Sequence, residues 1–325
     1  MAQHFLLSSA ARSLSLARVA RMSDEEALAT FKAIRWSDSH GEPYCPRCGC
    51  LTVYGRKSKA LWECKACGHV FSVTSGTIFA SRKMPLRDYL LAIAIFVNGA
   101  KGHSALQLSR DLDCQYKSAF VLAHKLREAL GAAPTGKVGG EGRDVEIDGM
   151  YAGGYVKPAN HKENRRDRRL AINQTGKRQV VVVMRERQGE SITAVYRSED
   201  QATPHVRNFV AIGSTIHADE ASHWDALHAH LVIKRINHSK VYSDGQSCTN
   251  QAESFFSRLR RAEIGTHHHI AGPYLASYAD EMAWRENYRR LSNGEQYLLA
   301  ANAAIKAPIS DRWAGYWQRA RHAAR

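Results

Sequence analysis

The sequence predicts an α/β protein in which two smaller modules precede a mixed-sheet domain. Four cysteines, paired within residues 41–75, indicate a compact metal-bound module. Residues 83–131 carry helical apolar spacing, and the Gly/Pro-rich stretch "GAAPTGKVGGEG", residues 131–142, is typical of a linker. Beyond the linker, strand-like runs come first and helices then alternate with strands, which is typical of a mixed α/β domain.

The elements expected after the linker follow from apolar periodicity. Strands are predicted at 144–151, 178–186, 190–197 and 213–218, and helices at 200–211, 221–230, 250–261 and 273–290. Glu281 and Arg285, at i and i+4 on the last helix, are expected to form an ion pair that contributes a few tenths of a kcal/mol if exposed.

Charge points to a polyanionic partner. The chain has 46 Lys and Arg against 31 Asp and Glu, a net charge of +15. Nucleic acid is the first candidate, because phosphate contacts supply most non-specific affinity. No apolar run reaches the roughly 18 residues that span a bilayer, so a soluble protein is expected. The seven cysteines, an odd number with four in C-x-x-C units, favour metal ligation in a reducing compartment over disulfides.

The first 40 residues are predicted to form a basic leader and an amphipathic helix. The opening stretch "MAQHFLLSSAARSLSLARVAR" is rich in Ser and Arg without acidic residues, a composition shared with organelle transit peptides. It leads directly into the helical pattern of residues 22–36, which favours a basic leader over a transit peptide.

A zinc ribbon is predicted at residues 41–75. "CPRCGC" and "CKACGH" place two C-x2-C knuckles at the spacing of a four-thiolate site, formed by Cys45, Cys48, Cys64 and Cys67. Such a site has no open position, so its Zn²⁺ stabilises the fold and does no catalysis. Cys50 is a rival ligand to Cys48, disfavoured by the regular spacing of the pairs.

Residues 83–131 resemble a helix-turn-helix DNA-binding module, although any small helical bundle would show the same pattern. One apolar stripe is predicted to be buried: Ala119, Leu122, Ala123, Leu126 and Leu130. Asp113 is a candidate N-cap for this last helix. The opposite face is expected to be polar and to meet DNA through Lys117 and Lys125, with Gln115, Ser118 and His124 beside them.

The run "VEIDGMYAGGY", residues 145–155, places carboxylates within a predicted strand. Alternation puts Val145 and Ile147 on one side, and Glu146 and Asp148 on the other. Asp148 is either a solvated strand residue beside a turn or a metal ligand. In the second case Gly149, Gly153 and Gly154 would keep side chains away from a bulky substrate, although ordinary turn glycines are equally compatible with Gly153 and Gly154.

Two further acids complete a candidate set. Asp219 ends a short strand, where it is alternatively a helix N-cap. Glu253 lies on a helix, away from the apolar stripe and on the same face as Arg260, but it also fits a capping box with Asn250. A mid-strand Asp, a strand-end Asp and a late helical Glu are how a ribonuclease H-like fold gathers three acids around two divalent ions.

These motifs resemble one family. "VEIDGMYAGGY", "TIHADEASHWDAL", "INHSKVYSDGQSCTNQAESFFSRLRRAEIGTHHHIAGPYL" and "EMAWRENYRR", behind a zinc ribbon, are similar to the ISXO-like DDE transposases of bacterial insertion sequences. The resemblance implies a ribonuclease H-like catalytic domain at 143–305 and a tail at 306–325. It also implies a cytoplasmic, nucleoid-associated enzyme that binds the terminal inverted repeats of its element, cuts them and joins them to target DNA.

Carried over residue by residue, the family's acids fall on Asp148, Asp219 and Glu253, and its later basic residue on Arg260. Many relatives have Asp-Glu where this chain has Asp148-Gly149, and some have Asn as third catalytic residue, which makes Asn250 the alternative. Mg²⁺ or Mn²⁺ is the expected catalytic ion. His238 is a candidate supporting residue.

DNA is the expected partner, and one active site per DNA end would require at least a homodimer. The loop 157–170 is predicted either to grip phosphates or to remain a solvated loop. Together with the helix face, the predicted DNA contacts beyond Lys117 and Lys125 are Arg165, Arg166, Arg168, Arg169, Arg260 and Arg261. A catalytically inactive DNA-binding protein and a nuclease that cuts without joining are the competing functions.

Overall fold

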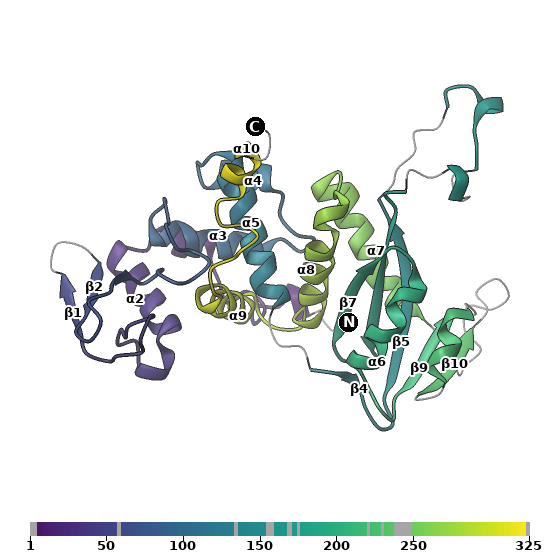
Figure 1. Cartoon of the computed structure of the whole chain (residues 1–325), viewed down its shortest axis with the longest axis horizontal. Helices are drawn as coiled ribbons and strands as arrows, with labels where there is room; N and C mark the ends of the chain where they lie inside the picture. Colours follow the sequence, from purple (N-terminus) through teal and green to yellow (C-terminus); the bar gives the residue numbers. More distant parts are fainter. Residues whose placement is uncertain are drawn as a thin grey trace. The chain divides into compact units, whose positions relative to one another are not determined.

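A computed structural model of the chain divides it into two compact units (Figure 1). The first comprises residues 1–133 and 289–325, and the second residues 134–288. The structure describes residues 5–56, 60–132, 136–153, 159–167, 171–173, 176–219, 222–228, 231–236 and 249–322. No helix in these described ranges is both long enough and apolar enough to cross a membrane.

The first unit begins with short helices and a three-stranded ribbon. The helices are η1 (Phe5–Leu7), α1 (Leu16–Ala20), α2 (Asp24–Arg35) and η2 (Ser37–Ser39). Helix α2, which confirms the predicted amphipathic helix, opens with a capping box between Ser23 and Glu26. The ribbon is antiparallel in the order β1-β2-β3: β1 (Val53–Arg56), β2 (Leu61–Cys64) and β3 (Val70–Ser72). The ring of Trp36, buried after α2, packs edge-on against Trp62 of β2.

A helical group completes the first unit: α3 (Leu86–Asn98), α4 (Ala105–Asp111), α5 (Tyr116–Gly131), α9 (Asn293–Lys306) and α10 (Tyr316–His322). Helix α3 is buried along most of its length, and α9 packs against α2, α3 and α5. The sequence prediction placed residues 289–305 in the catalytic domain, whereas they belong to the first unit here. The reason is the buried face of α9, including Ala301 and Ile305, whose partners lie far away in sequence.

The second unit is built on a mixed five-stranded sheet with the order β10-β9-β5-β6-β7. Strands β5 (Asp144–Ala152), β6 (Gln179–Glu186) and β7 (Ser191–Tyr196) form an antiparallel meander. On the other side of β5, β9 (Thr215–Asp219) runs parallel to it, and β10 (Val232–Ile236) runs parallel to β9. A short parallel pair joins β4 (Val138–Gly139) to β8 (Val210–Ala211). The four strands predicted from sequence are confirmed.

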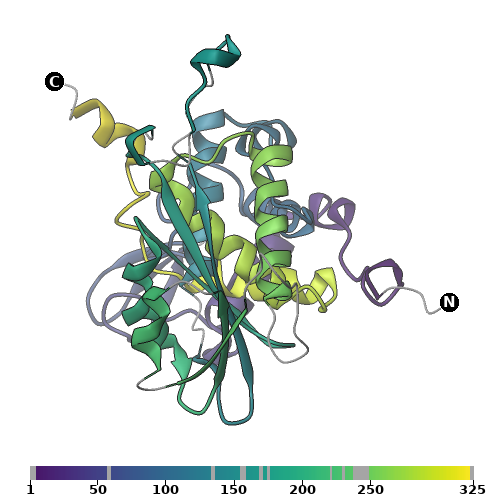
Figure 2. The ribbon, with the colours of Figure 1, turned by 90° about the vertical axis from the view of Figure 1, so that its right-hand side faces the viewer.

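Helices cover both faces of this sheet, dark green on one side and light green on the other in Figure 2. The face bearing Val145 and Ile147 packs against η5 (Glu199–Ala202), α6 (Thr203–Phe209) and η6 (Ser222–Leu227), and we name it the α6 face. The face bearing Met150 and Ala152 packs against α7 (Asn250–Ala262) and α8 (Leu275–Asn287), and we name it the α7 face. Shorter turns are η3 (Lys162–Asn164), η4 (Ala171–Asn173), η7 (Glu263–His267, a π-helical turn) and η8 (Gly272–Tyr274).

Buried ion pairs hold the α7 face together. Arg185 of β6 contacts Glu286 of α8 at 2.8 Å between Nη2 and Oε1, and both side chains are almost fully buried. Arg258 of α7 bonds the other oxygen of Glu286. Glu281 and Arg285 form the i,i+4 ion pair that the sequence predicted, and both side chains are buried. Removing one partner of a buried pair leaves the other charge uncompensated, so these contacts bear strongly on stability.

Candidate functional site

The cysteine knuckles are shaped by two tight turns. In the first, the N–H of Gly49 donates to the carbonyl of Cys45, and in the second the N–H of Gly68 donates to the carbonyl of Cys64. Gly49 and Gly68 have φ values of 73° and 64°, a left-handed conformation that favours glycine. The two glycines therefore let each chain segment turn so that its sulfurs point toward one centre.

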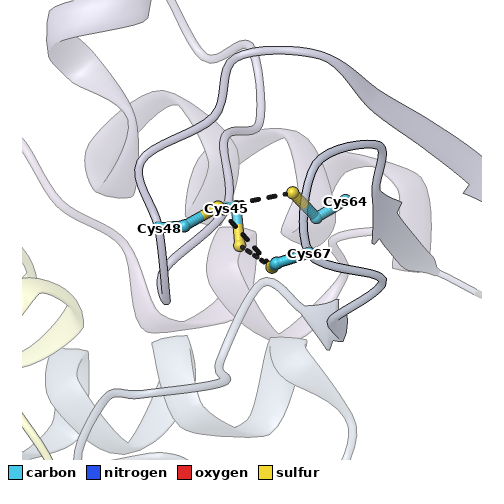
Figure 3. Close-up of side chains that lie close together, drawn as sticks. All are labelled: Cys45, Cys48, Cys64 and Cys67. Atoms are coloured by element: carbon cyan, nitrogen blue, oxygen red, sulfur yellow. Dashed lines mark hydrogen bonds between the residues drawn. The ribbon is translucent and has the colours of Figure 1, made fainter.

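The four sulfurs are grouped as a metal site requires (Figure 3). The Sγ atoms of Cys48 and Cys64 are 3.5 Å apart, those of Cys48 and Cys67 also 3.5 Å, and those of Cys45 and Cys67 3.7 Å. A tetrahedron with Zn–S bonds of about 2.3 Å has edges of about 3.8 Å. Backbone hydrogen bonding from Cys67 lowers the pKa of Cys64 to about 6, which favours the ligating thiolate. The residues present thus fit a structural Zn²⁺.

Cys50 is not part of this group. Its sulfur lies 3.6 Å from the carbonyl oxygen of Thr52, and its backbone carbonyl accepts the N–H of Cys45. The four grouped sulfurs are those of Cys45, Cys48, Cys64 and Cys67. The regular pair spacing therefore identified the cluster, and the Cys50 alternative is wrong.

Helix α5 presents less polar surface than the sequence predicted. The five residues of the predicted apolar stripe are all buried, which confirms that prediction. His124, expected on the polar face, is also fully buried, and its ring stacks on Trp313 with centroids 4.3 Å apart. Lys125 is half-buried: its Nζ donates to the carbonyl of Ile78 at 2.5 Å, and burial lowers its pKa. Lys117 remains exposed, with its Nζ 5.3 Å from the centroid of the Trp317 ring.

The start of α5 also differs from expectation. Its N-cap is Gln115, whose side chain makes no capping bond, while Asp113 adopts a left-handed φ of 47° in the turn after α4. Asp113 is therefore a turn residue and not the predicted cap. Beside α5 lies a groove of about 580 Å³ within the first unit, lined by basic and aromatic side chains that include Arg82, Lys83, Lys117, Tyr89, Trp313 and Trp317.

Asp148 and Asp219 lie where two parallel strands end their pairing. The β5–β9 register runs from Asp144 opposite Thr215 to Glu146 opposite His217. Asp148 and Asp219 come two residues further along each strand, beyond the last of these pairs, and both are half-buried. One Asp148 oxygen accepts the N–H of Gly149 at 2.7 Å, and one Asp219 oxygen accepts the indole N–H of Trp224 at 3.1 Å. Ligands in open α/β sheets bind beyond the carboxyl ends of such strands.

Helix α7, which carries Glu253, is anchored by Glu146. The helix begins at Asn250, and its first backbone N–H groups, those of Gln251 and Ala252, donate to Glu146 Oε2 at 2.7 and 3.1 Å. Because Glu146 and Asp148 point to the same face of β5, this bond places the first turn of α7 beside Asp148. The side chain of the N-cap residue Thr249 makes no capping bond, and no capping box forms here, so that alternative for Glu253 is wrong.

Glu146 itself is held by a cation. Its other oxygen accepts from Arg187 Nε at 2.9 Å, and its side chain is 1% exposed. Arg187 also approaches Asp144, whose pKa is lowered mainly by its 2.8 Å hydrogen bond with buried His217. Sequence reasoning noted Glu146 only as the neighbour of Asp148 and missed its capping role. The sequence did indicate that Glu146 lies on the same strand face as Asp148, and this position could have suggested a role for Glu146 beside Asp148.

We expect Glu146→Gln to lower the free energy of unfolding by about 2–3 kcal/mol. Glu146 uses one oxygen for α7 and the other for Arg187, whereas Gln has one oxygen and one NH₂ group. Both partners of Glu146, the α7 backbone N–H groups and Arg187, are donors, so one of them would face the NH₂ group of the glutamine, which is also a donor. Denaturant unfolding of the variant against exposed Glu190→Gln, which removes the same charge, measures the effect. Equal stability of the two variants would show that the cap contributes nothing.

A fourth acid, Glu199, belongs to this region. It is the first residue of η5, separated from β7 by two residues, Arg197 and Ser198, and is half-buried. Burial, and then the charges of Asp219 and Asp148, raise the pKa of Glu199 to about 7, while Arg178 lowers it. A Cβ built on Gly149 would lie 2.3 Å from Glu199 Oε1. Gly149 therefore leaves room for this carboxylate, whereas the sequence hypothesis assigned that room to DNA.

The other predicted residues are more scattered. Gly153 has a φ of 72°, a left-handed backbone conformation that favours glycine. Arg165, Arg166, Arg260 and Arg261 are exposed; Arg165 donates to the Ala159 carbonyl and Arg261 to Ser257. Asn250 is exposed and Glu253 half-buried. His238, Arg168, Arg169 and Gly154 lie outside the described residues. Within the described ranges, the cysteine cluster is the one group whose three or more ligand atoms all lie within 4.8 Å; the acids are spaced more widely.

The first unit contains the cysteine ribbon and a group of helices, and the second contains a mixed sheet with acids at the ends of parallel strands. Both parts of the chain match models of known protein families. Residues 138–287 match the ISXO2-like transposase domain, and residues 22–70 match the transposase zinc-ribbon domain. Together the two matches cover more than half of the chain. The chain thus carries an ISXO2-like transposase domain and a transposase zinc-ribbon domain, which confirms the resemblance seen in its motifs.

A curated relative agrees with this assignment. The chain is 27% identical over 158 residues, 48% of its length, to the "Uncharacterized protein in transposable element ISH50" of Halobacterium salinarum. The match spans about half of that relative, 51% of its length. No solved structure matches the chain.

Proposed function

We propose that this protein is a DNA transposase that binds the ends of its element, cuts them and joins them to target DNA with a divalent ion in the second unit. The observation that carries the proposal is the position of Asp148 and Asp219 just beyond the last paired residues of the adjacent strands β5 and β9, with the first turn of α7, the helix of Glu253, bonded to Glu146. The mixed sheet with helices on both faces fits the ribonuclease H-like fold that the family implies.

The carboxylates suit hard cations. Mg²⁺ and Mn²⁺ prefer oxygen ligands, and Asp148, Asp219 and Glu253 would supply them, while the thiolates select zinc. Divalent ions held by these residues would supply activation of the attacking hydroxyl and stabilisation of the leaving oxygen of a phosphodiester. The chain's own contribution is placement: β5 and β9 fix the two aspartates, and Glu146 fixes the helix that carries Glu253.

DNA contacts are assigned to both units. Exposed Lys117 on α5 and the basic, aromatic groove beside it would meet DNA in a helix-turn-helix-like manner. Arg260 and Arg261 on α7, and Arg165 and Arg166 near η3, would contact phosphates close to the acids. Lys125 is better assigned to the fold, because its ammonium already bonds the Ile78 carbonyl. A homo-oligomer on paired ends completes the proposal.

The proposal is tested with labelled duplexes that carry the element's own terminus or a scrambled copy. The zinc-loaded full chain should bind the true terminus more tightly, and Mg²⁺ should produce both a nicked strand and a product joined to target plasmid. Binding without cleavage would indicate a DNA-binding regulator. Cleavage without joining, with paired ends supplied, would indicate a nuclease.

We expect Glu253→Gln to abolish joining and Asn250→Ala to retain most of it. Glu253 is half-buried one turn into α7, whereas Asn250 is exposed at its first residue. Both variants keep the Glu146 cap, because it binds backbone N–H groups of other residues. Joining rates at saturating Mg²⁺ compare the two. Joining that survives Glu253→Gln but disappears in Asn250→Ala would move the third role to Asn250.

A further inference from the structure

Gly149 and Glu199 form a matched pair on the α6 face of the central strand. A Cβ built on Gly149 would approach Glu199 Oε1 at 2.3 Å, Cδ at 2.6 Å and Cγ at 2.8 Å. Glycine weakens a strand interior and often marks the close approach of another group. Here the approaching group is an ionisable carboxyl, and the glycine that it faces follows Asp148 in the sequence. Because Gly149 has no side chain, it leaves space for Glu199 on the α6 face.

The local charges make this arrangement unfavourable on its own. Glu199 is subject to the negative charges of both Asp219 and Asp148 in a half-buried setting. Arg178 offsets this in part, and its guanidinium lies 4.1 Å from the Tyr151 ring centroid. Carboxylates within electrostatic range of one another repel unless a proton or a cation neutralises them. A divalent ion at this place would turn the repulsion into attraction.

The geometry of the strands lets the Glu199 side chain approach the strand ends that carry Asp148 and Asp219. Asp148 lies on the α7 face by alternation with Ile147, whereas Glu199 approaches Gly149 from the α6 face. Asp219, at the end of β9, is reached from the α6 face as well, since it accepts the indole N–H of Trp224. Strand β9 ends at Asp219 and its pairing with β5 ends two residues earlier, while β5 continues to Ala152. Beyond the last pair, backbone no longer separates the two faces between these strands. A side chain from η5 therefore reaches the same opening as the two aspartates.

We propose that Glu199 is a further carboxylate of the active site and supplies an oxygen to the divalent ion held by Asp148 and Asp219. This inference rests on the proposed function, which places the ion there. Glu199 takes its position after β7, so the site draws on four elements: β5, η5, β9 and α7. In this arrangement residue 149 has to be glycine, since any larger residue would displace the Glu199 carboxylate.

The test compares Glu199→Gln with Asp200→Asn in the zinc-loaded full chain. Asp200 is the adjacent residue, is exposed, and loses the same charge when substituted. Mn²⁺ binding is measured by the electron paramagnetic resonance signal of free Mn²⁺, since this hard ion does not compete for the thiolate site. We expect Glu199→Gln to weaken Mn²⁺ binding by about 10-fold or more, the range seen even for outer-shell partners, and Asp200→Asn to change it less than about 2-fold.

Thermal unfolding distinguishes an ion-binding role of Glu199 from a role in packing alone. Without divalent ions Glu199→Gln should melt at or above the wild-type temperature at pH 8, because one of three like charges is gone. Adding Mg²⁺ should then stabilise the wild type more than the variant. A shorter acid, Glu199→Asp, should bind Mn²⁺ with intermediate affinity.

Two outcomes overturn the inference. Unchanged Mn²⁺ affinity in Glu199→Gln, with binding lost in Asp148→Asn, would leave the proposed function intact and Glu199 outside the ion site. Melting of both Glu199 variants well below wild type without divalent ions would assign Glu199 to packing. A wild type that neither binds Mn²⁺ nor joins DNA would instead refute the proposed function itself.

Discussion

Asp148→Asn is expected to lower the rate of strand joining by at least about 10²- to 10³-fold while the protein stays folded. Asn can still accept the Gly149 N–H through its amide oxygen, so the local backbone keeps its hydrogen bond. What is lost is the negative charge next to Asp219 and Glu199 that a divalent ion requires. Single-turnover joining with a pre-cut end measures the chemical step directly.

Asp144→Asn is the matched control for this loss. It makes the same substitution on the same strand face, but Asp144 is hydrogen-bonded to His217 and approaches Arg187. We expect joining to persist and stability to fall. Because His217 holds the folded-state pKa of Asp144 below its ordinary value, this contribution is present above the unfolded-state pKa and is lost as the pH falls through the folded one. Joining lost equally in both variants would place the ion elsewhere.

Local patterns predicted the parts of the site that depend on neighbours in sequence. The alternation of Val145, Glu146, Ile147 and Asp148 gave the strand and the correct faces, since side chains alternate whatever the partner strands are. Knuckle spacing likewise selected the four ligands of the ribbon. Both features are set by backbone geometry within a few residues, so a single sequence is sufficient to recognise them.

Features that depend on distant segments were missed. Glu199 is separated from Gly149 by two strands, and only the folded sheet shows that one leaves space for the other. His124 looked polar and exposed because its stacking partner Trp313 lies far along the chain. The cap on α7 comes from Glu146 instead of a local residue, so the local Asn250–Glu253 pattern was misleading. In each case a tertiary contact overrode a valid local expectation.

Zinc removal is expected to unfold the ribbon and abolish end binding, while the second unit keeps its own cooperative transition. Strands β1, β2 and β3 have only three or four residues each, too short to persist without a larger core or a metal. Structural zinc sites of this kind contribute roughly 10–16 kcal/mol of binding free energy to folding. Cys64→Ser should have the same effect as chelation, because it removes a buried ligand.

The tryptophan pair makes this change visible. Trp36 packs edge-on against Trp62 with ring centroids 5.3 Å apart, so unfolding of the ribbon should alter the near-ultraviolet circular dichroism and expose both rings. Cys50→Ser is the matched control: Cys50 lies beside the site, its sulfur faces the Thr52 carbonyl, and its loss should leave zinc content and end binding unchanged. The mixed sheet, with its apolar clusters on both faces, contains none of the four ligands and should melt at the same temperature in all variants. A ribbon that kept its tryptophan signal after chelation would show that the aromatic contacts alone hold it, and that zinc acts on DNA binding by another route.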